Sequence, residues 1–158
     1  MTITSTIIVT RTREDVWSFL ADLRNAPKWD RSIARATLTS NGPVGTGATV
    51  ETTSPGGQRQ SFRIIAFERP RLVRYRLLRS PLFRLAVLTF SLEPAAAGTK
   101  ITHEIRLRLR PWLAPLLLPV LGLIGRRALS TDMSFLRRSL EEGLDLTRPA
   151  PHGSVTGS

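Results

Sequence analysis

The chain of 158 residues is 41% hydrophobic, which is enough for one domain with a substantial buried core. It contains no cysteine, so disulfides, thiolate nucleophiles and cysteine-bound metals are excluded. Lys and Arg number 23 against 12 Asp and Glu, and the net charge of +11 raises nucleic acid and anionic lipid as partners. Nearly all the cations are arginines, as a GC-rich coding sequence would also produce, so the charge alone indicates no partner.

The first thirty residues predict a strand followed by a helix. Residues 3–10 are rich in β-branched types, which favour a strand. Thr12 and Asp15 have the spacing of a capping box at a helix start. The apolar residues that recur at helical spacing, and that predict a buried face, are Val16, Phe19, Leu20 and Leu23. The helix must end before Pro27, and residues 25–30 are expected to form a turn or a second short helix.

From residue 33 onward the pattern changes to strands separated by turn residues. The six candidate strands are 33–39, 47–53, 59–68, 71–78, 84–93 and 99–110. The last of them alternates, with His103 on the apolar face and charged residues on the other, which is typical of a half-buried antiparallel strand. Because the connections are short, the seven strands should form an antiparallel, strongly curved sheet.

The next segment, residues 112–125, is uncharged and lies between arginines. A membrane-spanning helix needs about 20 apolar residues, and Pro115 and Pro119 should break the helix here, so no span is expected. Two interpretations stay open. In the first, the segment is the broken entry to a long helix, with its leucines over a cavity mouth. In the second, it dips into a bilayer while Arg126 and Arg127 meet headgroups, and the two are compatible because a lid that opens at a membrane would load or deliver a lipid.

A long C-terminal helix should follow, because Leu129, Met133, Leu136, Leu140 and Leu144 recur at helical spacing. Residues 147–158 show no periodicity and are expected to be disordered. The expected fold is α+β over residues 1–146. A curved seven-stranded antiparallel sheet wraps around the long C-terminal helix, with two short helices after the first strand. A helix across a concave sheet leaves room for a ligand.

Four segments, at residues 12–30, 42–48, 66–76 and 98–107, resemble one known superfamily in their order and spacing. They correspond to its first helix pair with a tryptophan, Trp29, soon after a proline, its glycine-rich turn, its proline-containing hairpin and its final strand. The chain thus resembles the START-like (SRPBCC) superfamily with its helix-grip fold, in particular the polyketide cyclase/dehydrase branch. The resemblance implies an internal cavity for lipids, polyketides or other apolar molecules. It does not imply catalysis, because members include carriers, sensors and enzymes.

The cavity of such a fold would be lined from both layers. The residues expected to contact a ligand are Trp29, Leu38, Val50, Phe62, Ile64, Tyr75, Leu88, Phe90, His103, Ile105, Leu117, Met133, Leu136 and Leu140. His103 should point inward, where it could orient a ligand carbonyl or hydroxyl, shuttle a proton, or be satisfied by backbone or water. Tyr75 is the other inward polar residue, and the two could serve as acid and base in a polyketide-type aromatase/cyclase.

The expected function is therefore non-covalent binding of a hydrophobic small molecule, as a carrier or sensor. No cofactor or metal site is predicted, because the second histidine, His152, is in the tail and no turn has a phosphate-loop pattern. The absence of a signal-like N-terminus predicts a cytoplasmic protein. Arginines at residues 69–84 and 106–110 predict a basic sheet face that, with residues 112–125, could meet an anionic membrane. Few aromatics accompany them, so nucleic acid is not expected.

Overall fold

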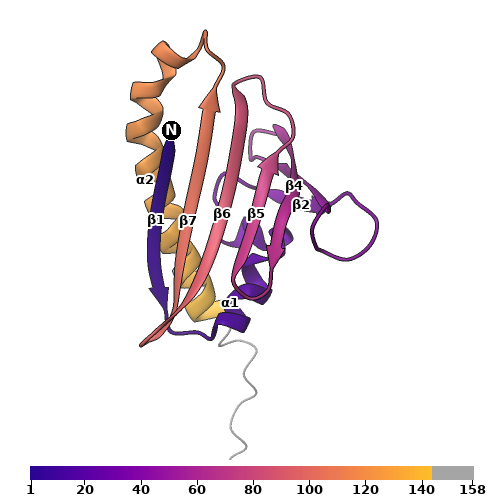
Figure 1. The fold of residues 1–158 in the computed structure, drawn as a ribbon, viewed down its shortest axis with the longest axis vertical. Coiled ribbons are helices and arrows are strands. Elements are labelled where there is room, and N and C mark those ends of the chain that lie inside the picture. Colours follow the sequence, from indigo (N-terminus) through magenta and orange to yellow (C-terminus); the bar gives the residue numbers. More distant parts are fainter. Residues whose placement is uncertain (144–158) are drawn as a thin grey trace, which may run out of the picture.

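Seven strands form one antiparallel sheet in the spatial order β1-β7-β6-β5-β4-β3-β2 (Figure 1). The structure is a computed structural model that describes residues 1–143, so Leu144 and the tail predicted from residue 147 lie outside the described residues. The strands are β1 (Thr2–Val9), β2 (Arg35–Leu38), β3 (Thr49–Thr53), β4 (Arg59–Glu68), β5 (Leu72–Leu77), β6 (Phe83–Ala95) and β7 (Gly98–Leu109). From β2 to β7 each strand lies beside the next in the chain, and β1 completes the sheet beside β7. The predicted sheet is confirmed.

The first helix, α1 (Arg13–Leu20), begins at the predicted cap. The Thr12 side chain accepts a hydrogen bond from the backbone N–H of Asp15 at 3.2 Å, which satisfies one of the free donors of the first turn. The buried face differs from the prediction: Phe19 is half-buried, and Trp17 is buried against Phe67 at a ring-centroid distance of 5.0 Å. The spacing of apolar residues alone did not show which of these two aromatic side chains is buried. Leu23 is buried as predicted but lies beyond the end of α1.

A short 3₁₀ helix, η1 (Leu23–Lys28), follows α1 and is the second of the two predicted short helices. Asp22 caps it by accepting a hydrogen bond from the backbone N–H of Arg24 at 3.0 Å. Pro27 lies inside η1, which is six residues long. Trp29 directly follows η1, and its side chain lies in the core, where it is 5% exposed.

The long helix α2 (Ala114–Gly143) runs without interruption, so the break predicted at Pro115 and Pro119 was wrong. Pro115 lies in the first turn, where a backbone N–H would have no helical partner anyway. Pro119 lies one turn later and removes a hydrogen bond without ending the helix. Within residues 1–143 no helix has the combination of length and hydrophobicity that crossing a bilayer requires.

Helix α2 packs along β1 and divides into two halves (Figure 1). Its C-terminal half buries Leu129, Met133, Leu136 and Leu140 in the same core cluster as the inner face of the sheet. Between residues 114 and 125, by contrast, none of the side chains that the structure describes is buried. Gly125 allows the helix to approach the sheet, since a Cβ there would be 2.7 Å from Cδ1 of Ile3. The fold therefore has a closed half and a loosely covered half.

Candidate functional site

An aromatic cluster occupies the inner face of the sheet. Phe90 of β6 and His103 of β7 are cross-strand partners whose rings stack at 4.0 Å with an angle of 14° between their planes. Trp29 meets both edge-on, at 5.6 Å from Phe90 and 6.3 Å from His103. All three side chains are buried. The cluster joins η1 to the centre of the sheet and encloses a single polar group.

That polar group, the His103 imidazole, is 3% exposed, and neither of its ring nitrogens has a hydrogen-bond partner within the described part of the chain. Burial lowers the pKa of His103 to about 3, so the ring is neutral at physiological pH. A neutral imidazole has one N–H donor and one lone-pair acceptor to satisfy. A buried group left unpaired costs about 1–3 kcal/mol. The hydrogen-bonding capacity of His103 is therefore unused within residues 1–143, although its ring is buried.

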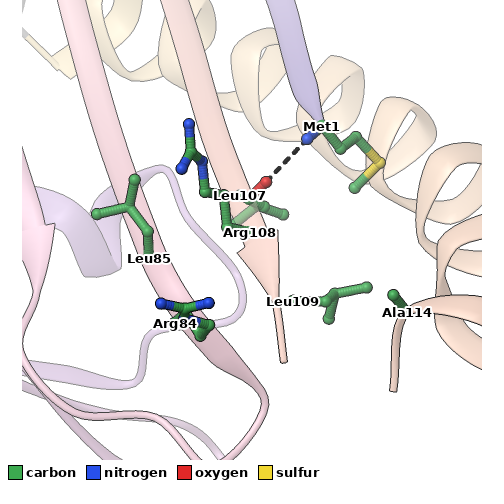
Figure 2. A pocket seen from close by; sticks show the side chains of 7 residues that line it. All are labelled: Met1, Arg84, Leu85, Leu107, Arg108, Leu109 and Ala114. Carbon is green, nitrogen blue, oxygen red and sulfur yellow. Dashed lines mark hydrogen bonds between the residues drawn. The ribbon is translucent and has the colours of Figure 1, made fainter. Parts of the chain in front are cut away.

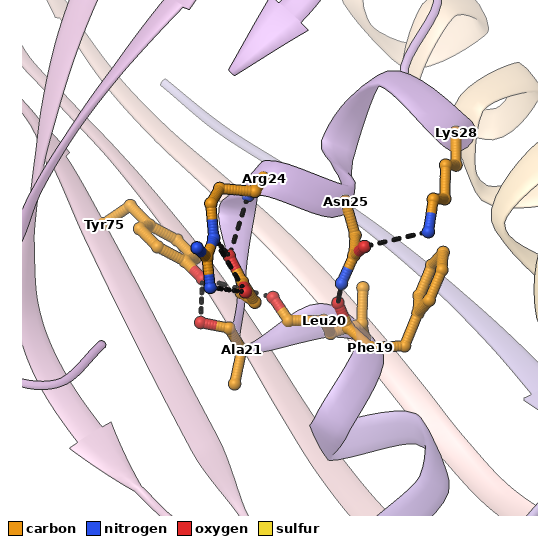
Figure 3. Close-up of polar contacts among 8 residues, drawn as sticks. Phe19, Leu20, Ala21, Arg24, Asn25, Lys28 and Tyr75 are labelled. Carbon is orange, nitrogen blue, oxygen red and sulfur yellow. Dashed lines mark hydrogen bonds and ion pairs between the residues drawn. The ribbon is translucent and has the colours of Figure 1, made fainter. Parts of the chain in front are cut away.

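Tyr75 is fully buried on β5, and its hydroxyl is already used (Figure 3). The O–H donates to the backbone carbonyls of Leu20 and Ala21, both at 3.1 Å, which satisfies acceptors at the end of α1. Burial, with a smaller contribution from the Asp22 carboxylate, raises the pKa of Tyr75 well above its ordinary value. The phenol therefore ties β5 to α1.

Strand β6 lies between the strands that carry Tyr75 and His103. An acid–base pair made of these two residues would require the Tyr75 hydroxyl to leave both carbonyls of α1. Figure 3 also shows the polar contacts that hold this region: Asp22 pairs with Arg24 at 2.6 Å, and the Asn25 amide donates to the carbonyl of Phe19 at 3.0 Å. The surroundings of Tyr75 are those of a structural anchor.

Beyond His103 the inner face becomes only half-covered. Ile105, Leu107 and Leu109 continue its alternation along β7, and each is half-buried. Leu88, the β6 partner of Ile105, is half-buried as well. In a fully packed two-layer core, side chains on this face would be covered by the helix. Here they lie toward the end of the sheet where α2 begins.

The half-covered face ends in a hollow of about 490 Å³, which we call the end pocket (Figure 2). Its lining comes from the ends of β6 and β7, the first residue of the chain and the start of α2: Met1, Arg84, Leu85, Leu107, Arg108, Leu109 and Ala114. The Met1 amino group donates to the carbonyl of Leu107 at 2.8 Å and fixes the first residue at the rim. The pocket is apolar toward the helix and carries arginines on its sheet side.

The residues predicted to line a cavity fall into three groups. Those packed in the closed core are Val50, Phe62, Ile64, Met133, Leu136 and Leu140. Those in or beside the aromatic cluster are Trp29, Tyr75, Phe90 and His103. Those that are half-buried are Leu38, Leu88, Ile105 and Leu117. None of the residues that line the end pocket was among the predicted contacts, although the alternation that selected Ile105 continues through Leu107 and Leu109.

The N-terminal half of α2 and the residues before it present an apolar stripe to solvent. Its members are Trp112 (72% exposed), Leu116 (72%), Val120 (51%) and Ile124 (58%). Leu116, Val120 and Ile124 recur every four residues along α2, which places them on one side of the helix, and Trp112 lies two residues before its start. Exposed Arg110, Arg126 and Arg127 lie at its two ends.

Within residues 1–143, no group of three or more His, Asp or Glu side chains is arranged to hold a metal ion.

Comparison with known proteins gives one family. The sequence model of the family described as "Polyketide cyclase / dehydrase and lipid transport" matches residues 1–143. No curated protein matches the chain in sequence.

Solved structures share the fold at low sequence identity. Protein TTHA0849 from Thermus thermophilus has a TM-score of 0.73 at 12% identity, covering 94% of this chain and 100% of its own. Protein MLL2253 from Mesorhizobium loti has a TM-score of 0.68 at 18% identity, with the same coverage. The di-domain ARO/CYC StfQ from the steffimycin biosynthetic pathway has a TM-score of 0.70 at 14% identity, covering 91% of this chain and 51% of its own. These structures and this chain share the fold.

Proposed function

We propose that this chain, which belongs to the polyketide cyclase/dehydrase and lipid transport family, binds a hydrophobic small molecule non-covalently between its sheet and α2. The observation that carries the proposal is the half-covered inner face of β7 from Ile105 to Leu109, which leads into the end pocket. Apolar surface removed from water contributes about 25 cal/mol per Å², so an apolar ligand gains affinity by completing this cover.

The ligand would carry one hydroxyl or carbonyl group at its deep end. His103 offers a donor and an acceptor without partners, two residues along β7 from Ile105. A hydrogen bond to a neutral partner in a dry site contributes about 0.5–1.5 kcal/mol, and a ligand that lacks the polar group leaves His103 unsatisfied. The proposed ligand is therefore an apolar molecule with a single internal polar contact.

We propose binding in preference to polyketide-type cyclisation because of Tyr75. Acid–base catalysis by His103 and Tyr75 requires both side chains to contact one substrate. The Tyr75 hydroxyl instead donates hydrogen bonds to the backbone carbonyls of Leu20 and Ala21. If cyclisation were the function, Tyr75→Phe would abolish turnover and leave ligand binding intact. Under the binding proposal, Tyr75→Phe lowers stability by about 1 kcal/mol and leaves ligand affinity unchanged.

The test combines native mass spectrometry of protein purified without detergent with titration of an uncharged apolar fluorophore, N-phenyl-1-naphthylamine. We expect an added mass that denaturation removes, and saturable fluorophore binding. Leu107→Gln, which makes the end pocket polar, should weaken fluorophore binding about tenfold. Ile8→Gln is the matched control, because Ile8 is 47% exposed on β1 and lies outside the pocket. A bare mass together with no saturable binding would exclude the proposal.

We also propose that the apolar stripe on the N-terminal half of α2 contacts an anionic membrane surface. Its four exposed apolar side chains and the arginines at its ends match the layered chemistry of acyl chains and anionic headgroups. Docking there would place the end pocket, which includes Ala114 of the same helix, close to the bilayer.

Vesicle co-sedimentation tests this contact. Wild type should bind phosphatidylglycerol vesicles and not phosphatidylcholine vesicles, with a blue shift in Trp112 emission. Leu116→Gln combined with Ile124→Gln should lose binding without losing stability, since both side chains are more than half exposed. Ile65→Thr, on an exposed position of β4, is the control for loss of surface hydrophobicity. Undiminished binding by the double variant would refute the contact.

A further inference from the structure

A second hollow, of about 660 Å³, lies at the same end of the sheet and is built largely from arginines. It is lined by Arg59, Leu78, Arg79, Ser80, Pro81, Phe83, Arg84 and Arg110, and we call it the arginine pocket. These residues come from the start of β4, the β5–β6 loop, the start of β6 and the end of β7. Arg84 also lines the end pocket, so the two hollows are neighbours.

None of the described residues that line the arginine pocket carries a carboxylate. Arg59 has one loose ion pair, with Glu51 at 3.7 Å. Among residues 1–143, no acidic side chain lies within ion-pair distance of Arg79, Arg84 or Arg110. Guanidinium groups stay charged at any physiological pH, so the four repel one another. A bound anion would remove that repulsion and gain the attraction of all four.

The backbone around the pocket is held in place without help from the arginine side chains. The Ser80 hydroxyl accepts hydrogen bonds from the backbone N–H groups of Leu82 and Phe83, at 3.1 and 3.2 Å. The backbone N–H of Arg110 donates to the carbonyl of Leu82 at 3.1 Å, and that of Leu78 to the carbonyl of Ser61 at 2.8 Å. The β5–β6 loop is thereby tied to both β4 and the end of β7. A binding site whose frame exists before the ligand arrives loses less entropy on binding.

We propose that the arginine pocket binds a phosphate group, carried either by a lipid headgroup or by a soluble phosphate ester. The planar fork of a guanidinium matches two phosphate oxygens at once, and four arginines line this one hollow. Leu78 and Leu82 beside the pocket are 40% and 43% exposed, which gives an apolar rim to the charged centre. The site does not depend on the interior ligand, so it adds to the proposed function.

Titration calorimetry with glycerol 3-phosphate and with inorganic phosphate tests the site. Arg59→Gln combined with Arg79→Gln, two lining residues that have no part in the apolar stripe, should weaken binding about tenfold or more, because two charge-assisted contacts are lost. The control is Arg63→Gln combined with Arg76→Gln. It makes the same change in net charge at two exposed residues that face each other across β4 and β5, outside the pocket. The control should bind phosphate as wild type does.

A second arm uses vesicles of phosphatidylcholine with and without phosphatidic acid, and it identifies the source of the phosphate. Binding to phosphatidic acid vesicles that the pocket variant loses and the control keeps supports a lipid headgroup. The same pattern for soluble phosphate alone supports a soluble ester. Equal binding by pocket variant and control in both arms would overturn the proposal, because net charge would then suffice. The proposal would also be overturned if wild type bound neither the soluble phosphates nor the phosphatidic acid vesicles.

The outcome can be separated from that of the interior site. Neither Arg59 nor Arg79 lines the end pocket, so the double variant should bind N-phenyl-1-naphthylamine with wild-type affinity. If the double variant loses phosphate binding and keeps fluorophore binding, the arginine pocket and the end pocket are separate binding sites. A shared loss, with an unchanged melting temperature, would show that the pockets form a single site and would overturn the separate phosphate site.

Discussion

At the scale of single residues, His103 is in an unusual position for a histidine. Its ring stacks on Phe90 and is covered by Trp29, so it has the packing of a core aromatic residue without any hydrogen bond in the described structure. A phenylalanine would fit the same contacts without the cost of two unsatisfied nitrogens. The presence of histidine there makes stability depend on pH.

Stability should fall as the pH falls below about 6.5, where the unfolded histidine gains a proton that the folded one, with a pKa of about 3, does not. The loss contributed by His103 is about 1.4 kcal/mol per pH unit in that range. Between pH 7 and pH 5, His103→Phe should therefore gain about 2 kcal/mol in unfolding free energy relative to wild type. Urea denaturation at the two pH values measures it.

His103→Gln serves as the control for this prediction. It keeps a polar side chain and removes only the titration, so it should show the same reduced pH dependence as His103→Phe. It should lack the gain of about 1–3 kcal/mol that comes from removing unsatisfied polar atoms. If the unfolding free energy of wild type changed with pH by the same amount as that of both variants, the prediction would be wrong. His103 would then have the same pKa in the folded and unfolded states.

At the scale of secondary-structure elements, two glycines have opposite roles. Gly98, at the start of β7, has a φ of 140°, and a Cβ there would lie 2.2 Å from the carbonyl oxygen of Val9. The β6–β7 hairpin therefore reaches the end of β1 only because this residue has no side chain. Gly122 lies inside α2, and no atom of the described side chains lies within 4 Å of its Cβ position.

Gly98→Ala should lower the unfolding free energy by about 2 kcal/mol or more, through both the backbone conformation and the contact with Val9. Gly122→Ala should raise it by about 1 kcal/mol, because alanine is the better helix former and meets no neighbour. Chemical denaturation of both variants is the measurement. Two changes of the same sign would contradict the assigned roles.

The two halves of α2 also differ in how they are held. In the C-terminal half, the Ser139 hydroxyl donates to the carbonyl of Lys28 at 2.8 Å, and the Phe135 ring lies 5.3 Å from the Arg31 guanidinium. These contacts join the helix to the segment around η1, in addition to its buried leucines. No described side chain between residues 114 and 125 is buried, so this half of the helix is the part that can separate from the sheet at the lower cost in free energy.

At the scale of the whole molecule, the sequence predicted the architecture well because local patterns decide it. The alternation around His103 and the short turns specify antiparallel neighbours, and the spacing from Leu129 to Leu140 specifies a long helix with one buried face. The continuity of α2 through Pro119 was missed, since a proline near a helix start is tolerated where one in the middle is not.

The two pockets were beyond prediction for a different reason. The arginine pocket joins Arg59 and Arg110, about fifty residues apart, and their meeting depends on which strand ends share one edge of the sheet. The end pocket includes Met1, which joins Leu107 only through the pairing of the first strand with the last. Sequence patterns identify faces of elements, whereas pockets form where the ends of several elements meet.

The pairing of β1 with β7 has a practical consequence for handling the protein. Because Met1 lies at the rim of the end pocket, with its amino group on the carbonyl of Leu107, any affinity tag fused ahead of it would begin at that rim. Such a tag would crowd the opening. Binding studies should therefore use protein from which an N-terminal tag has been removed completely.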